Sequence, residues 1–336
     1  MLQEQTITCL PDTKIYICCS AGNATGGPEA LHQLAYHLNQ LGFNAMMYYY
    51  QTPDSVGMVH ENYKKFNIPY VTKPENDGKH VMIMPETYLF PIFKRKFNRI
   101  RKVIWWLSVV NYYKTQKPGV NDAKPKGLLA TIKARKQASF ARIKEKGVLN
   151  IAHSYYSLMH LKENGIEPIG QISDYMNDVF FELAAHEEKK EDIIIYNPKK
   201  NDEFLEEIIR LTPDLSWKPL ANMTPAEVGN WMNRAKLYVD FGYHPGKERM
   251  PREACIMRCC MIVGKSGSAA YQPDMPIPEK YRFEKERGQI PDIIEQIRAC
   301  IGDYDQLIND FRPYREALYQ EKKVFIEAIK KVFVTI

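Results

Sequence analysis

Short apolar segments that resemble strands alternate with amphipathic segments that resemble helices over most of this chain, and this alternation most constrains its fold. The first half predicts strands at 14–19, 44–50, 80–84, 102–110 and 148–152. The second half predicts strands at 192–196, about 216–220, 237–241 and 260–264, and helices at 202–211, 224–235 and 251–258. Because strands that alternate with helices form parallel sheets covered by helices, we expect an α/β fold.

The length and a restart of the pattern indicate two domains. A chain of 336 residues corresponds to about two domains, and a second alternating series begins near Gly170. We therefore expect a Rossmann-like domain at 1–168 and a second α/β domain at 169–312. The remaining residues, 313–336, contain the amphipathic stretch Tyr314–Val334, which predicts a long terminal helix.

Cysteine usage and hydropathy indicate a cytoplasmic protein. No uncharged apolar run approaches the ~20 residues that span a bilayer, and residues 1–14 lack the basic start and apolar stretch of a signal peptide. The seven cysteines, several of them adjacent within apolar strands, predict reduced core thiols rather than a disulfide framework. Cys255 and Cys259 have no nearby ligand partners, so we expect no zinc.

Positive charge is concentrated in one segment. Residues 94–147 hold 16 Lys or Arg and two acids, whereas the rest of the chain holds 30 basic and 38 acidic residues. Within it, residues 114–147 form a lysine-rich insert that interrupts the alternation, and 128–146 predicts a helix. The segment matches no nucleic-acid recognition module and the remainder is acidic, so we expect no nucleic-acid partner. A solvated insert and contact with an anionic surface both remain open.

The most informative segment is the turn between strand 237–241 and the helix that we expect to begin at Pro251. Proline suits a first helical turn, and a helix N-terminus collects unpaired N–H groups that favour a phosphate. His244 lies in a Gly-Tyr-His-Pro-Gly turn, and Lys247 and Arg249 follow it. Glu253, in the expected first helical turn, either complements the helix dipole, worth ~0.3–1 kcal/mol, or accepts hydrogen bonds from ribose hydroxyls.

Two further strand ends carry candidate ligand contacts. Asn197, Lys199 and Lys200 follow strand 192–196, and ligands of open α/β sheets gather at the carboxyl ends of strands. Paired lysines suit phosphate; a solvated loop is the alternative. Gly26 and Gly27 lie in a glycine-rich loop between a strand and a helix, where the backbone can approach a ligand or only form a tight turn.

Two observations limit the ligand of this glycine-rich loop. The loop is not Gly-x-Gly-x-x-Gly, and tyrosines at 48–50 replace the acid that a dinucleotide ribose requires, so we do not expect NAD. At other strand ends of the first half lie Trp106, Ser108, His153 and Tyr155. An aromatic ring at such a strand end can stack on a sugar, although packing in the core is its commoner role.

Taken together, these residues resemble the GT-B glycosyltransferases. Residues 237–258 and the following GKSGSA loop resemble the donor site of the retaining family 4-like enzymes of bacterial capsule, O-antigen and related glycan synthesis. The segment GGPEALHQLAYHLNQLGFNA is similar to the first loop and helix of that fold, and IIIYNPKK to the first strand of its donor domain. The resemblance spans nearly the whole chain.

The resemblance implies two Rossmann-like domains facing across a cleft, with residues 313–336 crossing back to the N-terminal domain. It implies a metal-independent, cofactor-free hexosyltransferase that uses a nucleotide-diphosphate sugar and a glycan or polyprenyl-diphosphate-linked acceptor, docked through residues 94–147 at the anionic inner face of the membrane. The implied catalytic residues are His244, Lys247 and Arg249. The implied donor-binding residues are Gly26, Gly27, Asn197, Lys199, Lys200, Gly246, Glu248, Glu253 and Ser268, and the acceptor-side residues are Trp106, Ser108, His153 and Tyr155.

One position departs from the family pattern. Family 4 enzymes typically carry two glutamates separated by seven residues. Glu253 matches the second, but Pro245 occupies the position of the first, and neither His244 nor Glu248 fits the spacing. The role of the first glutamate therefore has no residue, and retention of configuration rests on the resemblance alone. Two alternatives remain open: a nucleotide-sugar epimerase or hydrolase, and a non-catalytic nucleotide-sugar or glycan-binding component of an assembly complex.

Overall fold

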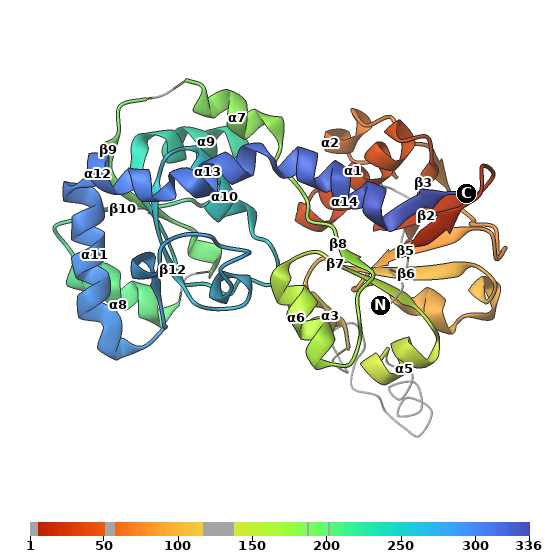
Figure 1. The fold of residues 1–336 in the computed structure, drawn as a ribbon. Coiled ribbons are helices and arrows are strands. Elements are labelled where there is room, and N and C mark those ends of the chain that lie inside the picture. The colour runs from red at the N-terminus through yellow and green to blue at the C-terminus, as the bar shows by residue number, and fades with distance from the viewer. Residues whose placement is uncertain (1–5, 51–57, 117–137, 187, 201) are drawn as a thin grey trace. The chain divides into compact units, whose positions relative to one another are not determined.

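The computed structural model describes residues 6–50, 58–116, 138–186, 188–200 and 202–336. They belong to two compact units: unit 1 comprises Met1–Asp174 with Lys323–Ile336, and unit 2 comprises Tyr175–Lys322 (Figure 1). The units therefore change over at 174/175 and 322/323, whereas the sequence predicted boundaries at 168/169 and 312/313. The shift arises because strand β8 (Gly170–Gln171) pairs with unit 1, and helix α13 (Arg312–Tyr319) packs on helix α10 (Arg249–Ile256) of unit 2.

Unit 1 is built on a seven-stranded parallel sheet with the strand order β4-β3-β2-β5-β6-β7-β8. Its strands are β2 (Lys14–Ser20), β3 (Asn44–Tyr50), β4 (Tyr70–Val71), β5 (Val81–Pro85), β6 (Arg101–Trp106), β7 (Leu149–Ala152) and β8. The five predicted strands are present, but β6 ends at Trp106 rather than at 110. The Ser108 hydroxyl there accepts the backbone N–H of Asn111 at 3.2 Å and helps to begin a helix instead.

Helices connect the strands of unit 1 (Figure 1). They are α1 (Gly26–Gln40), α2 (Glu61–Lys64), η1 (Phe90–Phe93), η2 (Arg95–Phe97), α3 (Val109–Gln116), α5 (Phe140–Glu145) and α6 (Tyr155–Glu163). Of the helix predicted at 128–146, residues 140–145 form α5, and 128–137 lie outside the described residues.

The C-terminal tail differs from the single long helix that the sequence predicted. It forms α13, α14 (Glu321–Val332) and a final strand, β14 (Phe333–Thr335), which pairs in parallel with the N-terminal strand β1 (Ile7–Cys9). The end of α14 packs closely on β8, because a Cβ at Gly170 would lie 2.6 Å from Val332 Cγ2. A larger residue at this position would require the Val332 side chain or the helix to shift.

Unit 2 contains a five-stranded parallel sheet with the order β10-β9-β11-β12-β13. Its strands are β9 (Glu191–Tyr196), β10 (Ser216–Pro219), β11 (Ala235–Asp240), β12 (Cys260–Gly264) and β13 (Arg282–Phe283). Its helices are α7 (Asp178–Ala184), η3 (Pro198–Lys200), α8 (Glu203–Leu211), α9 (Pro225–Arg234), α10, η4 (Ser268–Ala270), η5 (Glu279–Tyr281), η6 (Arg287–Gln289), α11 (Ile290–Gly302), α12 (Tyr304–Leu307), η7 (Ile308–Phe311) and α13.

The helix predicted to begin at Pro251 begins two residues earlier, at Arg249, with Glu248 in extended conformation before it. Pro251 is tolerated at the third helical position because the first four N–H groups of a helix have no partner within it. Glu253 consequently lies in the second turn, not the first, where the favourable effect of the helix dipole on an acid has decayed.

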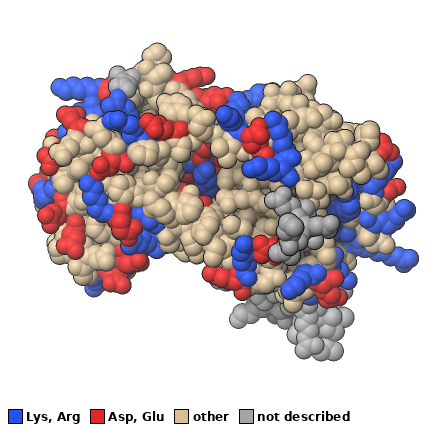
Figure 2. All heavy atoms as spheres, viewed as in Figure 1, with Lys and Arg blue, Asp and Glu red and all other residues tan. Residues whose placement is uncertain are grey.

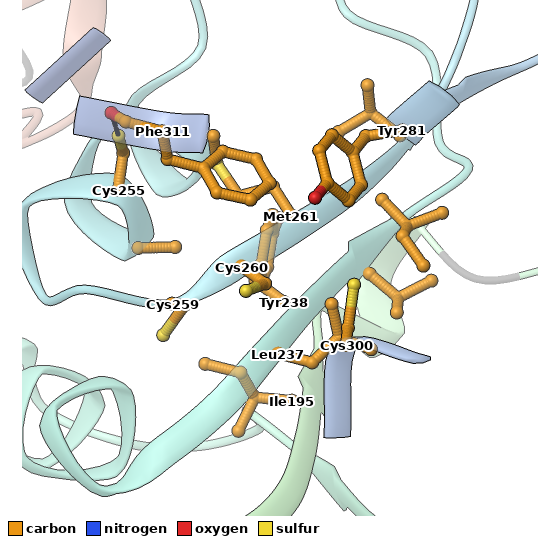
Figure 3. Close-up of a cluster of buried hydrophobic side chains, with 14 of the residues drawn as sticks. Ile195, Leu237, Tyr238, Cys255, Cys259, Cys260, Met261, Tyr281, Cys300 and Phe311 are labelled. Carbon is orange, nitrogen blue, oxygen red and sulfur yellow. Dashed lines mark hydrogen bonds between the residues drawn. The ribbon is translucent and has the colours of Figure 1, made fainter. Parts of the chain in front are cut away.

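The core of unit 2 is rich in sulfur (Figure 3). Cys255, Cys259 and Cys260 lie on or beside α10 and β12, and Cys300 approaches from α11. All seven cysteines of the chain are buried and unbridged, and their burial confirms the prediction that they lie in the core. Burial raises the pKa of Cys255 above the ordinary thiol range, so its thiol stays protonated and behaves as a small apolar group.

Candidate functional site

The turn that follows β11 is joined by hydrogen bonds to the loop after β12. The Ser266 hydroxyl donates to the carbonyl of Gly242 at 3.0 Å, and the Ser268 hydroxyl donates to that of Gly246 at 2.5 Å. The backbone N–H of Ser268 donates to the carbonyl of His244 at 2.9 Å. Hydrogen bonds therefore join these two loops at the carboxyl edge of the sheet. They place His244, Gly246 and Ser268 close together.

Gly267 makes this joint possible. Its φ of +56° and ψ of −131° belong to a region that is essentially restricted to glycine. A Cβ at this position would lie 1.9 Å from the carbonyl oxygen of His244. The small-residue loop GKSGSA thus has a structural cause, since Gly267 allows its backbone to pass directly against the turn.

His244 and Asp240 form a buried pair beneath the turn. The side chain of His244 is fully buried, and neither ring nitrogen has a hydrogen-bond partner among the described residues. Its Nε2 lies 3.5 Å from Asp240 Oδ2, beyond a good hydrogen bond but within reach of a charge interaction. Buried polar groups without partners are rare in native proteins and are concentrated at functional sites.

The Asp240 carboxylate is held in its ionised form. It accepts a hydrogen bond from the Tyr238 hydroxyl at 2.8 Å and from the Gly242 N–H at 2.9 Å. Burial alone would raise the pKa of Asp240, but His244, the Lys200 ammonium 3.9 Å away and the Tyr238 hydroxyl favour the charged form. The pKa of Asp240 therefore lies well below its usual range, and the turn is built over a fixed negative charge.

Two lysines predicted to bind a diphosphate are ion-paired within unit 2. Lys200 Nζ lies 2.8 Å from Glu248 Oε2, and Lys247 Nζ lies 2.7 Å from Glu321 Oε1. Gly242 lets the Lys200 side chain cross the turn, because a Cβ there would lie 2.5 Å from Lys200 Cβ. The positive charges of Lys200 and Lys247 are therefore each compensated by an acid. Their ammonium groups are held in position by these ion pairs.

Other predicted donor-site residues lie at the same edge of unit 2. The Asn197 side chain accepts the backbone N–H of Lys199 at 3.1 Å and shapes η3, on which Lys199 is exposed. Arg249 is the partly buried first residue of α10. Glu253 is buried, with 9% of its surface exposed. The structure thus brings together the predicted donor-binding residues of the second half of the chain.

The predicted residues of unit 1 lie at the carboxyl edge of its own sheet. Gly26 and Gly27 open α1 after β2, and a Cβ at Gly27 would lie 3.7 Å from Leu107 Cδ1. Trp106 is fully buried, and its indole N–H donates to Asn150 Oδ1 at 2.8 Å, so its ring packs in the core. The buried Ser108 hydroxyl faces the start of α3.

His153 has a carboxylate partner that orients its ring. Its Nε2 lies 3.2 Å from Asp174 Oδ1, while its buried Nδ1 has no hydrogen-bond partner among the described residues. Trp105 packs edge-on against the ring, with centroids 5.9 Å apart. Tyr155, two residues later, is the partly buried first residue of α6.

Glu86 was not predicted from the sequence. It follows β5 directly, is 2% exposed, and accepts the backbone N–H of Leu107 at 2.9 Å. Burial raises the pKa of Glu86 to about 7, against hydrogen bonds from backbone N–H groups that favour the carboxylate. The sequence did contain one sign of this residue, since Glu86 is an acid that directly follows an apolar strand. Its carboxyl group holds the loop that carries Ser108.

Within the ranges that the structure describes, no three His, Cys, Asp or Glu side chains gather as they would around a metal ion. No helix in the same ranges combines the length and the apolar character needed to cross a bilayer.

The arrangement of elements matches solved structures, although no protein-family model and no curated protein matches the sequence. Sucrose-phosphate synthase from Thermosynechococcus elongatus aligns with a TM-score of 0.62 at 12% identity, over 94% of this chain and 97% of that one. A glycosyltransferase from Rickettsia africae aligns with a TM-score of 0.60 at 13% identity, over 95% of both chains. The Anabaena protein HepE, in complex with UDP-glucose, aligns with a TM-score of 0.59 at 12% identity, over 94% and 98%.

The chain has the GT-B fold. The agreement extends over nearly its full length, as the resemblance of its motifs implied. At 12–13% identity the alignments establish the GT-B architecture alone. The activity depends on the residues of the site in this chain.

Proposed function

We propose that this protein is a glycosyltransferase that moves a sugar from a nucleotide-diphosphate sugar to a glycan or lipid-linked glycan acceptor in bacterial surface-polysaccharide synthesis. The observation that carries the proposal is the turn from Gly242 to Glu248. It lies at the carboxyl edge of the sheet, is joined to the GKSGSA loop, and contains the buried His244, whose ring nitrogens have no hydrogen-bond partner among the described residues. The similar fold of HepE, which was solved in complex with UDP-glucose, supports a nucleotide-sugar donor.

In this proposal the diphosphate lies against the N-terminus of α10 and the ammonium group of Lys247. The ammonium group of Lys247 has three N–H donors and forms an ion pair with Glu321, whose Oε1 lies 2.7 Å away. As the glycosidic bond breaks, negative charge grows on the leaving phosphate, and donors already in place stabilise it without reorganisation. The proposed chemistry uses no metal and no cofactor.

The proposed stereochemical course is retention, as in the family 4 enzymes that the motifs resemble. Pro245 offers no carboxylate at the position of the first family glutamate, and the residue beside it, His244, is paired with Asp240 beneath the turn. Proton NMR of the first-formed product measures its anomeric configuration directly. An inverted product would refute retention and leave the assignment of the donor site intact.

Replacement of Lys247 and of Arg249 by alanine tests the site. Each variant should lose at least about 100-fold in transfer rate, because charge on the leaving group is no longer stabilised, while circular dichroism and the melting temperature of unit 2 remain close to wild type. Lys280→Ala is the matched control, because it also removes a lysine of unit 2 that is paired with an acid, Asp310. Near-normal turnover in both site variants would reject the assignment.

The same assay separates the alternatives. Donor turnover at full rate without any glycan would indicate an epimerase or hydrolase. Donor binding without turnover across a broad acceptor panel would indicate a non-catalytic component. We assign Ser108, His153 and Tyr155 to the acceptor side within this proposal, because they lie at the carboxyl edge of the unit 1 sheet.

We further propose that the protein works in the cytoplasm and docks on the anionic inner face of the membrane through its basic segment. Within the described part of that segment, Lys94, Arg95, Lys96 and Arg99 are exposed. Phe90 is 46% exposed, and Lys94 Nζ lies 4.5 Å from its ring centroid. On the face drawn in Figure 2, acidic and basic side chains are interspersed. Each lysine or arginine near an anionic surface contributes ~1 kcal/mol.

Co-sedimentation with vesicles measures this docking. Binding to vesicles that contain anionic lipid should exceed binding to neutral vesicles and should weaken in salt. Equal binding to both kinds of vesicle, or none, would remove the membrane proposal.

A further inference from the structure

Glu321, the first residue of α14, is buried against the turn that we assign to the donor. Its two carboxylate oxygens contact different cations: Oε1 lies 2.7 Å from Lys247 Nζ, and Oε2 lies 3.0 Å from Arg252 Nη1. Only 7% of the Glu321 side chain and none of the Arg252 side chain is exposed. These two basic residues and one acid carry a net charge of +1.

Arg252 and Lys247 differ in their hydrogen bonds to the protein and in their exposure to solvent. Arg252 donates through Nε to the carbonyl of Glu248 and through Nη2 to the carbonyl of Lys247, both at 3.1 Å, in addition to its contact with Glu321. All three of its nitrogens therefore face the protein, and its role is to shape the turn. Lys247 is ion-paired with Glu321, its ammonium group has three N–H donors, and 17% of its side chain reaches solvent.

We propose that Glu321 is a positioning residue for the donor diphosphate: it fixes the ammonium group of Lys247 beside the N-terminus of α10. The inference rests on the proposed function and adds a residue that no sequence motif marks. A lysine side chain has four flexible carbons, so holding its end in one place ordinarily costs conformational entropy when the ligand binds. Glu321 imposes that order before the ligand arrives, and the net charge of +1 still favours an anion.

The first test needs no nucleotide. Lysines of the full-length wild type, Glu321→Gln and Glu327→Gln are acetylated with sulfo-NHS acetate, and the extent is read by mass spectrometry. Glu327 is the control, because it pairs with Lys330 on the exposed surface of the same helix. Lys247 should react several-fold faster in Glu321→Gln only, while exposed Lys199 stays unchanged. An unchanged rate at Lys247 would overturn the proposal.

The second test links Glu321 to the diphosphate. Calorimetry compares UDP with UMP, since the second phosphate is the group that Lys247 is proposed to contact. Glu321→Gln should reduce the preference for UDP over UMP by at least about tenfold, and Glu321→Asp should restore part of it. An unchanged preference, or an equal loss of both affinities together with a lower melting temperature, would show a merely structural role. If wild type binds no nucleoside diphosphate, the proposed function fails, and the acetylation result still decides whether Glu321 holds Lys247.

Discussion

Replacement of Gly267 by alanine should disrupt the joint between the turn and the loop after β12. The backbone of Gly267 has φ +56° and ψ −131°, and an added Cβ would lie 1.9 Å from the carbonyl oxygen of His244 and 2.8 Å from its carbonyl carbon. Alanine in such a conformation costs on the order of 1–3 kcal/mol. The contact is also more than an ångström too short, so backbone has to move.

Movement of that backbone breaks specific hydrogen bonds. The backbone N–H of Ser268 donates to the carbonyl of His244 at 2.9 Å. The Ser268 hydroxyl donates to the carbonyl of Gly246 at 2.5 Å. Each such bond contributes about 0.5–1.5 kcal/mol net. We therefore expect Gly267→Ala to lower the unfolding free energy of unit 2 by about 2–6 kcal/mol, through the strained backbone and through displacement of the turn that holds His244.

Two other glycines separate the causes of this loss. Gly42 has φ +87° with open space around its Cβ position, so Gly42→Ala measures the cost of a left-handed backbone alone, about 1–2 kcal/mol. Gly302, at the end of α11, also has open space but no positive φ, so Gly302→Ala should be neutral or slightly stabilising. Because a chain of two units need not unfold in two states, hydrogen exchange with mass spectrometry should follow each unit separately. A loss for Gly267→Ala no larger than that for Gly42→Ala would refute the close approach.

Two further substitutions test buried polar groups. Glu86 has a folded-state pKa of about 7, above its unfolded value of about 4.5, so the folded protein holds the proton more tightly and stability falls by roughly 3 kcal/mol as pH rises between these values. Glu86→Gln should flatten this dependence in urea unfolding at pH 5 to 8; an unchanged slope would mean that another group titrates. Lys190 donates to the carbonyls of Met232, Ala235 and Met257 at 3.0, 2.9 and 2.5 Å. Lys190→Met should lower the unfolding free energy by about 2–3 kcal/mol, and the exposed neighbour variant Lys189→Met should not; equal effects would argue against this network.

Several of the strands that the sequence predicts are buried on both faces. β2, β5, β11 and β12 are nearly continuous apolar runs, as expected for parallel strands covered by helices on each side. The strands that it misses have two or three residues each and are bounded by loops. β14 shows the limit, since its three residues look like the end of an amphipathic helix and become a strand only by pairing with β1.

The candidate site was predictable where its residues are neighbours in the chain. His244, Gly246 and Lys247 belong to one turn, so proximity in sequence guarantees proximity in space. Glu321 contacts Arg252 across 69 positions, and no local pattern at the start of α14 marks it as a partner of the turn. For the same reason the sequence suggested uncompensated lysines, whereas the structure pairs Lys200 and Lys247 with acids.

This pairing changes how the turn is expected to bind an anion. Several unpaired cations brought this close together and half buried would repel one another and lose hydration, so a folded protein has to compensate them before any ligand arrives. The structure does so with Asp240, Glu248 and Glu321, each of which also fixes the position of a lysine, a histidine or an arginine. Binding energy would then come from donors that are already oriented, namely the N–H groups of Lys247 and the start of α10, in addition to the net charge of +1 on Lys247, Arg252 and Glu321. A site of this kind favours an anion of one shape over other anions of equal charge, which is what transfer from one particular sugar donor requires.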